Sequence, residues 1–135
     1  MPAGYSKTPL AKKLGIKQGF KIRLINTPEN YLALFDDMPD VEFMDGPMGI
    51  KNFIHLFASR GDQLLYVLPG LKNEITANGI IWVSWPKKAS KIVTDVSESL
   101  VRDLALKNGL VDIKVCAVDD IWSGLKLVIP VKDRK

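Results

Sequence analysis

The sequence predicts one α/β domain over residues 1–135, a three-layer Rossmann-like sandwich with a mostly parallel sheet and a C-terminal antiparallel hairpin. Apolar runs typical of strands alternate with stretches in which apolar residues recur at helical spacing. The last two runs, Val111–Asp119 and Leu125–Val131, are joined by a tight connection at Ser123 and Gly124, which predicts the hairpin. No internal repeat or linker divides the chain, and 135 residues are enough for one hydrophobic core.

Two helices and three strands are expected in the first half of the chain. In chain order they are a helix at Ser6–Leu14, a strand at Phe20–Asn26, a helix from Thr27, and strands at Val41–Met44 and Asn52–Ala58. The second helix start is indicated by a capping threonine, a first-turn proline and an acid at Thr27, Pro28 and Glu29. The run Asn52–Ala58 has few polar positions, which predicts a strand buried on both faces.

Two more helices and a central strand are expected in the second half, before the hairpin. They are a helix from Asp62 to Asn78 that Pro69 and Gly70 kink or split, a strand at Ile80–Trp85, a polar loop at Pro86–Thr94, and a helix at Val96–Asn108. Asp95, with Glu98 three residues later, has the pattern of a capping box for the last helix. Because Ile80–Trp85 is the most strongly apolar strand, we expect it at the centre of the sheet.

Composition and charge exclude several classes of protein. The net charge is +4, but no RNP-type motif, zinc finger or recognition helix accompanies the basic residues, so we do not expect nucleic acid as a partner. No apolar run approaches the roughly 20 residues that span a membrane, and the N-terminus lacks a signal-peptide pattern, so a cytoplasmic location is expected. The single cysteine, Cys116, and single histidine, His55, form no disulfide and do not supply the ligands of a structural zinc site. We therefore expect no metal and no cofactor.

Five segments of the chain carry a resemblance to a known family. They are Ala3–Leu10, Lys13–Ile16, Trp82–Ser90, Gly109–Asp119 and Trp122–Val128. Together these strings resemble a family of small bacterial proteins described as a domain of unknown function. The resemblance covers nearly the whole chain and implies no assigned reaction.

A looser resemblance rests on the order of the elements. A strand, a helix after Asp62, a strand from Ile80, another helix and a closing antiparallel hairpin are similar to the Rossmann-like S-adenosylmethionine-dependent methyltransferases. In that family a glycine-rich turn after the first strand lets the cofactor approach the backbone, whereas Asn26–Asn30 stands there in this chain and contains no glycine. One βα unit is also missing after the second strand. Asp45, at the end of that strand, stands where the family has the acid that binds the cofactor ribose, with a simple turn residue as the alternative.

Three loops are expected to meet beyond the carboxyl ends of the strands, where open α/β sheets bind ligands. They supply a candidate anion site made of Asn26, Thr27, Arg60, Gly61, Trp85, Lys87, Lys88 and Ser90. This set combines cations, hydroxyl and amide groups, an aromatic wall and helix N-termini, which suits a phosphate or a carboxylate. The strands that end at Ala58 and Trp85 are expected to be neighbours, which would bring their loops side by side. The alternative is a set of well-capped loops with solvated lysines.

No residue is expected to be catalytic. His55 lies in mid-strand between Phe53 and Phe57, which favours a buried, hydrogen-bonded structural histidine. Cys116 alternates with Lys114 along its strand, and a packed, inert thiol is favoured although Lys114 could activate it. The chain contains no Ser-His-Asp, P-loop or paired-histidine motif.

Three hypotheses of function follow. The leading one is a non-enzymatic binding domain for a small anionic ligand or a protein partner. The first alternative is a degenerate methyltransferase-like enzyme. The second alternative is a structural protein that self-associates into a homo-oligomer through a sheet edge or a helix face. Separately, we expect that S-adenosylmethionine does not bind tightly, because side chains in the turn after Asn26 should block its close approach.

Overall fold

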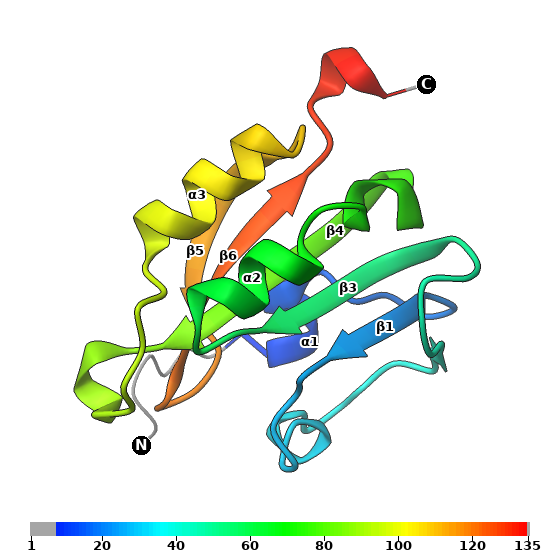
Figure 1. The fold of residues 1–135 in the computed structure, drawn as a ribbon. Helices are drawn as coiled ribbons and strands as arrows, with labels where there is room; N and C mark the ends of the chain where they lie inside the picture. The colour runs from blue at the N-terminus through cyan, green and yellow to red at the C-terminus, as the bar shows by residue number, and fades with distance from the viewer. Residues whose placement is uncertain (1–7, 135) are drawn as a thin grey trace.

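The structure, a computed structural model, describes residues 8–134, so the expected helix start at Ser6 lies outside the described residues. The described part of the chain forms one six-stranded sheet in the order β2-β1-β3-β4-β6-β5 (Figure 1). The strands are β1 (Lys21–Ile25), β2 (Glu42–Phe43), β3 (Lys51–Phe57), β4 (Ile75–Pro86), β5 (Val111–Ala117) and β6 (Trp122–Val128). The strands β1 to β4 are parallel, and β6 runs antiparallel to both β4 and β5. The predicted fold class is therefore confirmed.

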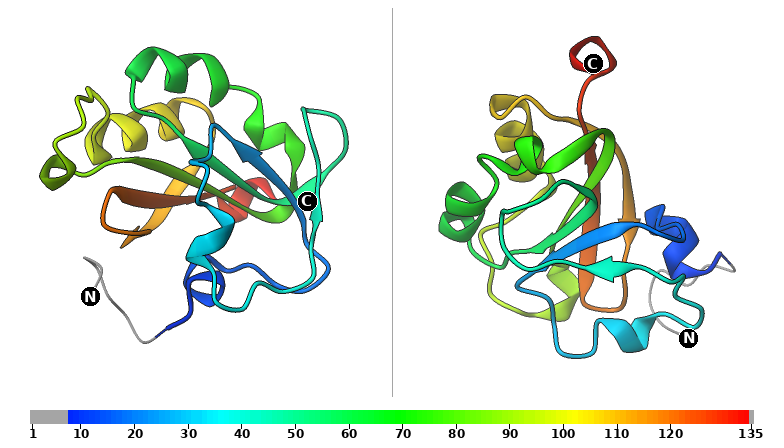
Figure 2. Two further views of the ribbon diagram at one scale, coloured as in Figure 1. Left: turned by 90° about the horizontal axis from the view of Figure 1, so that it is seen from below. Right: turned by 90° about the vertical axis from the view of Figure 1, so that its right-hand side faces the viewer.

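Helical segments cover both faces of the sheet, which gives three layers (Figures 1 and 2). One face carries α2 (Gly61–Val67) and α3 (Glu98–Lys107), and the other carries α1 (Leu10–Leu14) and a 3-10 helix at Leu32–Leu34. Three further 3-10 helices lie at Leu71–Glu74, Lys88–Ser90 and Val131–Asp133.

Alternate residues of the central strands belong to two hydrophobic cores, one on each face of the sheet. Ile54, Leu56 and Val83 pack under α2 and α3 in the first core, while Phe53 and Trp82 pack under α1 in the second. The strand β3 is thus buried on both faces, as predicted from its apolar run. The indole Nε1 of Trp82 donates a 2.8 Å hydrogen bond to the carbonyl of Leu14, which ties α1 to the sheet.

Two helix predictions are wrong: one helix is absent, and the other is shorter than expected. No α-helix follows Thr27; the chain instead makes turns and the 3-10 helix Leu32–Leu34. The helix predicted from Asp62 to Asn78 is split at Pro69 and Gly70, as expected, but α2 ends at Val67, only a 3-10 helix follows, and β4 already begins at Ile75.

Glycine and asparagine signals near the strands account for two further errors. Asn78 and Gly79 lie inside β4, at an irregularity in its pairing with β3, rather than at a helix end. Ser123 and Gly124 lie inside β6, and the hairpin turn precedes them. A Cβ on Gly124 would lie 3.1 Å from the indole of Trp82 and 3.2 Å from the hydroxyl of Ser84, so this glycine allows close packing rather than a turn.

The cap of α3 differs from expectation, whereas an acid caps the hairpin turn as expected. The hydroxyl of Ser97, not the carboxylate of Asp95, accepts the hydrogen bond from the backbone N–H of Leu100 at the start of α3. In the turn, the carboxylate of Asp119 accepts hydrogen bonds of 2.8 Å from the backbone N–H groups of Ile121 and Trp122.

Both edges of the sheet are irregular. At one edge β2 has only two residues, Glu42 and Phe43, and both are exposed. At the other edge β5 has a bulge between Asp112 and Lys114 in its pairing with β6.

Candidate functional site

The carboxyl ends of β1, β3 and β4 lie at one edge of the sheet because these strands are parallel neighbours. The expectation that β3 and β4 are neighbours is confirmed, since Phe57 pairs with Ser84 near their ends. This edge is where the eight candidate residues were expected to converge. They follow the three strands in turn: Asn26 and Thr27 after β1, Arg60 and Gly61 after β3, Trp85 within β4, and Lys87, Lys88 and Ser90 after β4.

The cation and the helix start that follow β3 already have partners within the chain. The guanidinium of exposed Arg60 donates to both carboxylate oxygens of Asp62, at 2.9 and 2.7 Å, and this pairing raises the pKa of Arg60 and lowers that of Asp62. The backbone N–H of Gly61 donates a 2.7 Å hydrogen bond to Asp95 Oδ1. A carboxylate of the protein itself therefore stands at the N-terminus of α2, where an anionic ligand was expected.

The loop before α3 is hydrogen-bonded to the loop after β3, next to the N-terminus of α2. The hydroxyl of Thr94 donates a 2.6 Å hydrogen bond to the carbonyl of Ser59, and it accepts one of 3.0 Å from the backbone N–H of Val96. This position brings Asp95 to Gly61. A Cβ on Gly61 would lie 3.2 Å from Asp95 Oδ2, so the two segments are closely packed.

The residues at the end of β4 serve mainly the local structure. Trp85 is 8% exposed and belongs to the first core, so it does not form an aromatic wall on the surface. The hydroxyl of Ser90 donates a 2.6 Å hydrogen bond to the carbonyl of Lys87, whose backbone N–H donates to the carbonyl of Ile121. Within residues 8–134, no hydrogen bond or ion pair involves the ammonium group of Lys87 or Lys88.

The segment after β1 packs against the sheet. Asn26 has the left-handed φ of 57°, and Tyr31 is 2% exposed four residues after Thr27. The hydroxyl of Tyr31 lies 2.9 Å from Nδ1 of His55 in β3, and its ring makes edge contacts with Phe35 and Phe57. The segment after β1 is therefore anchored over β3 by a buried aromatic side chain.

His55 is a fully buried structural histidine, as predicted. Its Nδ1 contacts Tyr31, its Nε2 lies 2.8 Å from the hydroxyl of Ser84, and its ring stacks on Phe57. Burial lowers the pKa of His55 to about 3 and raises the pKa of Tyr31. Because His55 and Ser84 are both 0% exposed, this pair cannot meet a substrate in the folded protein.

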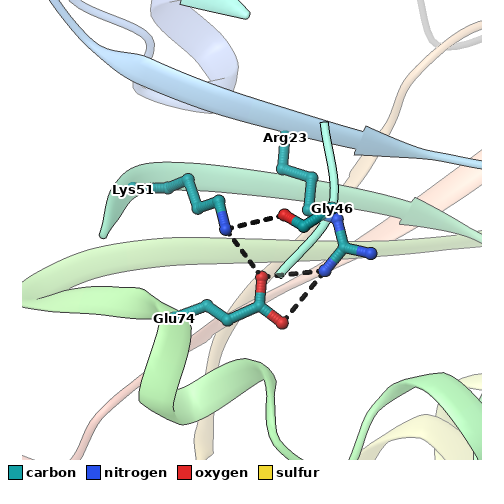
Figure 3. Close-up of polar contacts among 4 residues, drawn as sticks. All are labelled: Arg23, Gly46, Lys51 and Glu74. Atoms are coloured by element: carbon teal, nitrogen blue, oxygen red, sulfur yellow. Dashed lines mark hydrogen bonds and ion pairs between the residues drawn. The ribbon is translucent and has the colours of Figure 1, made fainter. Parts of the chain in front are cut away.

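A second buried polar cluster joins the starts of β3 and β4 to the middle of β1 (Figure 3). Lys51, which is 0% exposed, donates to Glu74 Oε1 at 3.0 Å and to the carbonyl of Gly46 at 2.9 Å. Arg23 donates to both carboxylate oxygens of Glu74, at 2.8 and 2.9 Å. The cluster joins β1, β3, the 3-10 helix before β4 and the loop after β2, and its groups satisfy one another, so its role is structural.

The α1 face of the hairpin carries a cluster of basic side chains that was not singled out from the sequence. Lys114 and Lys126 are direct partners in the β5–β6 register. The ammonium group of Lys13 donates a 2.9 Å hydrogen bond to the carbonyl of Ala117, and Lys17 is close enough to lower the pKa of Lys126, for which burial is the larger cause. We call Lys13, Lys17, Lys114 and Lys126 the hairpin lysines. The signal in the sequence was the hairpin register, which depends on the turn being placed correctly.

Cys116 lies among these lysines and is half-buried, not buried as its apolar surroundings predicted. Burial raises the pKa of its thiol, while Lys13 and Lys114 act in the opposite direction. Burial is the larger effect, so the geometry does not favour the thiolate that a nucleophile needs.

A hollow of about 260 Å³ opens beside α1. It is lined by Pro9, Ala11, Lys12, Gly15, Ile16, Lys17, Asp37 and Pro39. An ideal Cβ on Gly15 would lie 4.0 Å from Nζ of Lys126, so the hollow adjoins the hairpin lysines.

Over residues 8–134, no group of three or more His, Cys, Asp or Glu side chains could hold a metal ion. Likewise, none of the helices described is long and apolar enough to cross a bilayer.

Asp45 follows β2 and is exposed, and the chain passes from there to β3 without the βα unit that the methyltransferase resemblance requires.

Comparisons with known proteins place the fold. No family model and no curated protein matches the chain, so the resemblance to the small bacterial family gains no support from them. Among solved structures, the chain is similar to a ribosomal protein L11 methylase from Lactobacillus delbrueckii subsp. bulgaricus. The TM-score is 0.59, with 12% identity over 89% of this chain and 74% of that one.

Two further solved structures have the same fold. LepI in complex with SAM matches with a TM-score of 0.53 and 15% identity. The match covers 89% of this chain but only 39% of LepI. The B. subtilis M1A22 tRNA methyltransferase TrmK matches with a TM-score of 0.52 and 12% identity, over 96% of this chain and 69% of that one. At such low identity the likeness establishes a methyltransferase-like fold and nothing about the reaction.

Proposed function

We propose that this chain is a degenerate methyltransferase-like domain that works by binding a small anionic ligand rather than by transferring a methyl group. The fold likeness supports the first half of the proposal, since the similar structures include two methyl-transfer enzymes by name. The resemblance to the small bacterial family and a cytoplasmic location are part of the same proposal, the latter supported by the single free cysteine.

The observation that carries the proposal is the closed turn after β1. In the methyltransferases that the chain resembles, a glycine-rich turn there lets the cofactor approach the backbone. Here Asn26, Thr27 and Pro28 occupy the turn, and Tyr31 fills the space above β3 with a ring that is 2% exposed. Opening that space would separate the hydroxyl of Tyr31 from His55 and leave buried polar atoms without partners, which costs about 1–3 kcal/mol for each group.

The experiment is a calorimetric titration of the purified chain with S-adenosylmethionine and with its demethylated product. We expect no heat of binding at micromolar concentrations, for the wild type and for Tyr31→Phe, which keeps the ring in place. Transfer of a labelled methyl group to protein or RNA of a cell extract should also be absent. A dissociation constant of micromolar or tighter for either compound would contradict the proposal and favour a working methyltransferase.

A further inference from the structure

The hairpin lysines are placed in a way that the fold itself does not require. Lys114 and Lys126 face each other across neighbouring antiparallel strands, an arrangement in which like charges destabilise a sheet. Lys126 is in turn the register partner of the buried Trp82 on β4, so its stem lies close to the second core. Local rules of this kind are most often broken where a protein binds something.

The hairpin lysines have no ion-pair partner among the described residues. The ion pairs formed within residues 8–134 involve Arg23, Lys51, Arg60, Lys72 and Arg102, and none of the four hairpin lysines. Lys13 finds only a carbonyl, that of Ala117. The pKa of Lys126 is lowered by burial first and then by the charges of Lys114 and Lys17.

We propose that the hairpin lysines bind the phosphate groups of a small ligand, with Lys114 and Lys126 as the central pair. This inference rests on the proposed function and names the class of anionic ligand that it requires. A diphosphate suits the site because several cations converge on one place, on the α1 side of a single hairpin, and lysine binds phosphate as a point charge.

The adjoining hollow gives the rest of the ligand a place. Gly15 and Lys17 belong to its lining, and Lys126 lies next to Gly15. Asp37 also lines it, and its carboxylate would repel a phosphate. The phosphates are therefore assigned to the lysines, and the hollow takes the uncharged part of the ligand.

A nucleic-acid backbone is the competing source of phosphate. Binding of a single strand normally combines a basic groove with aromatic side chains on which bases stack. On this face Trp82 is 0% exposed and lies inside the second core, so it offers no stacking surface. The geometry therefore favours a compact ligand over a polymer.

The test compares two double variants that remove the same charge. Lys114→Gln with Lys126→Gln removes the central pair, and Lys107→Gln with Lys132→Gln is the matched control at two exposed lysines outside both candidate sites. Inorganic pyrophosphate, ADP and a short single-stranded RNA are titrated by calorimetry at low and high salt. Thermal unfolding of each protein without ligand reports whether it folds.

We expect pyrophosphate and ADP to bind the wild type and the control alike, and to bind the hairpin variant about tenfold or more weakly. High salt should weaken the wild-type affinity. Without ligand, the hairpin variant should unfold at the same or a higher temperature, because a repulsion is removed. Should the double variant not fold, the single change at exposed Lys114 carries the same comparison.

Four results would overturn the inference. They are no binding of pyrophosphate or ADP to the wild type, an equal loss in both double variants, a loss only in the control, and binding of RNA alone. Failure here is distinct from failure of the proposed function. Tight binding of S-adenosylmethionine would refute that function whatever pyrophosphate does, and a lack of pyrophosphate binding leaves the closed turn after β1 untouched.

Discussion

The carboxylate of Asp95 accepts a 2.7 Å hydrogen bond from the backbone N–H of Gly61, the first residue of α2. An acid from the loop before α3 thus caps a helix that begins 34 residues earlier in the chain. The bond links the two helices on this face of the sheet at one point, and it satisfies a backbone donor that the short helix cannot satisfy itself.

Asp95→Ala should lower the free energy of unfolding by about 1 kcal/mol, the usual cost of losing a side-chain cap. Urea denaturation measures the loss. Asp103→Ala is the matched control, because Asp103 is an exposed acid within α3. Equal stability of the Asp95 variant and wild type would mean that the bond to Gly61 contributes nothing in solution.

His55 should make the stability fall in mild acid. Its pKa is near 6.5 in the unfolded chain and is lowered to about 3 in the folded protein by burial. Below pH 6.5 the unfolded chain therefore binds a proton that the folded protein does not, and stability falls by about 1.4 kcal/mol per pH unit until pH 3. Above pH 6.5 this contribution does not change with pH.

Urea denaturation between about pH 7.5 and pH 4.5 tests this, because most carboxylates titrate below that range. His55→Gln keeps groups that hydrogen-bond to Tyr31 and Ser84 but does not titrate, so its stability should be nearly flat over the same range. A wild-type slope that persists in this variant would show that another group causes it.

Glu74→Gln should be strongly destabilising. The change leaves Arg23 and the fully buried Lys51 without their carboxylate, and breaking a buried ion pair costs about 3–5 kcal/mol. Asp62→Asn is the control, since its ion pair with Arg60 is two-thirds exposed, at 67% and 66%, and solvent screens it. Adding Lys51→Met to Glu74→Gln should restore part of the loss by removing one unpaired charge. Similar behaviour of the two single variants in urea denaturation would contradict the structural role of the buried cluster.

Cys116 should react with a neutral alkylating reagent more slowly in the folded protein than in urea. It is half-buried, and burial raises the pKa of its thiol. Lys114→Gln should slow the alkylation of Cys116 in the folded protein further, because Lys114 lowers the pKa of the thiol. Lys87→Gln should leave the rate unchanged. Iodoacetamide labelling followed by mass spectrometry gives the rates, and a folded-state rate equal to that in urea would exclude a protected thiol.

The fold class could be predicted because apolar runs such as Ile80–Trp85 alternate with stretches in which apolar residues recur at helical spacing. The failures come from contacts between distant segments. Thr27–Pro28–Glu29 has the chemistry of a helix start, but the buried contact of Tyr31 with His55 fixes the following residues as turns and a 3-10 helix. Local preference is a weak guide when a tertiary contact of this kind decides the backbone.

For the candidate site, too, the topology could be predicted and the contacts between distant residues could not. Its place at the carboxyl edge of parallel strands follows from topology, and β3 and β4 are indeed neighbours. What the sequence did not reveal is that Asp95 and Asp62 supply the anionic groups there from within the chain. The pairing of Lys114 with Lys126 could not be predicted either. Gly124 was expected in the turn, and a turn at that position gives the two strands a different register.

The irregular edges of the sheet also decide how two copies of the chain could meet. A long, flat outer strand exposes a row of unpaired N–H and C=O groups and invites another chain to extend the sheet. The two residues of β2 offer such a row almost no length, and the bulge between Asp112 and Lys114 interrupts it on β5. Lys114 adds a charge at that edge, which further opposes pairing with an identical chain. Both edges of the described sheet therefore oppose growth into fibres by strand addition.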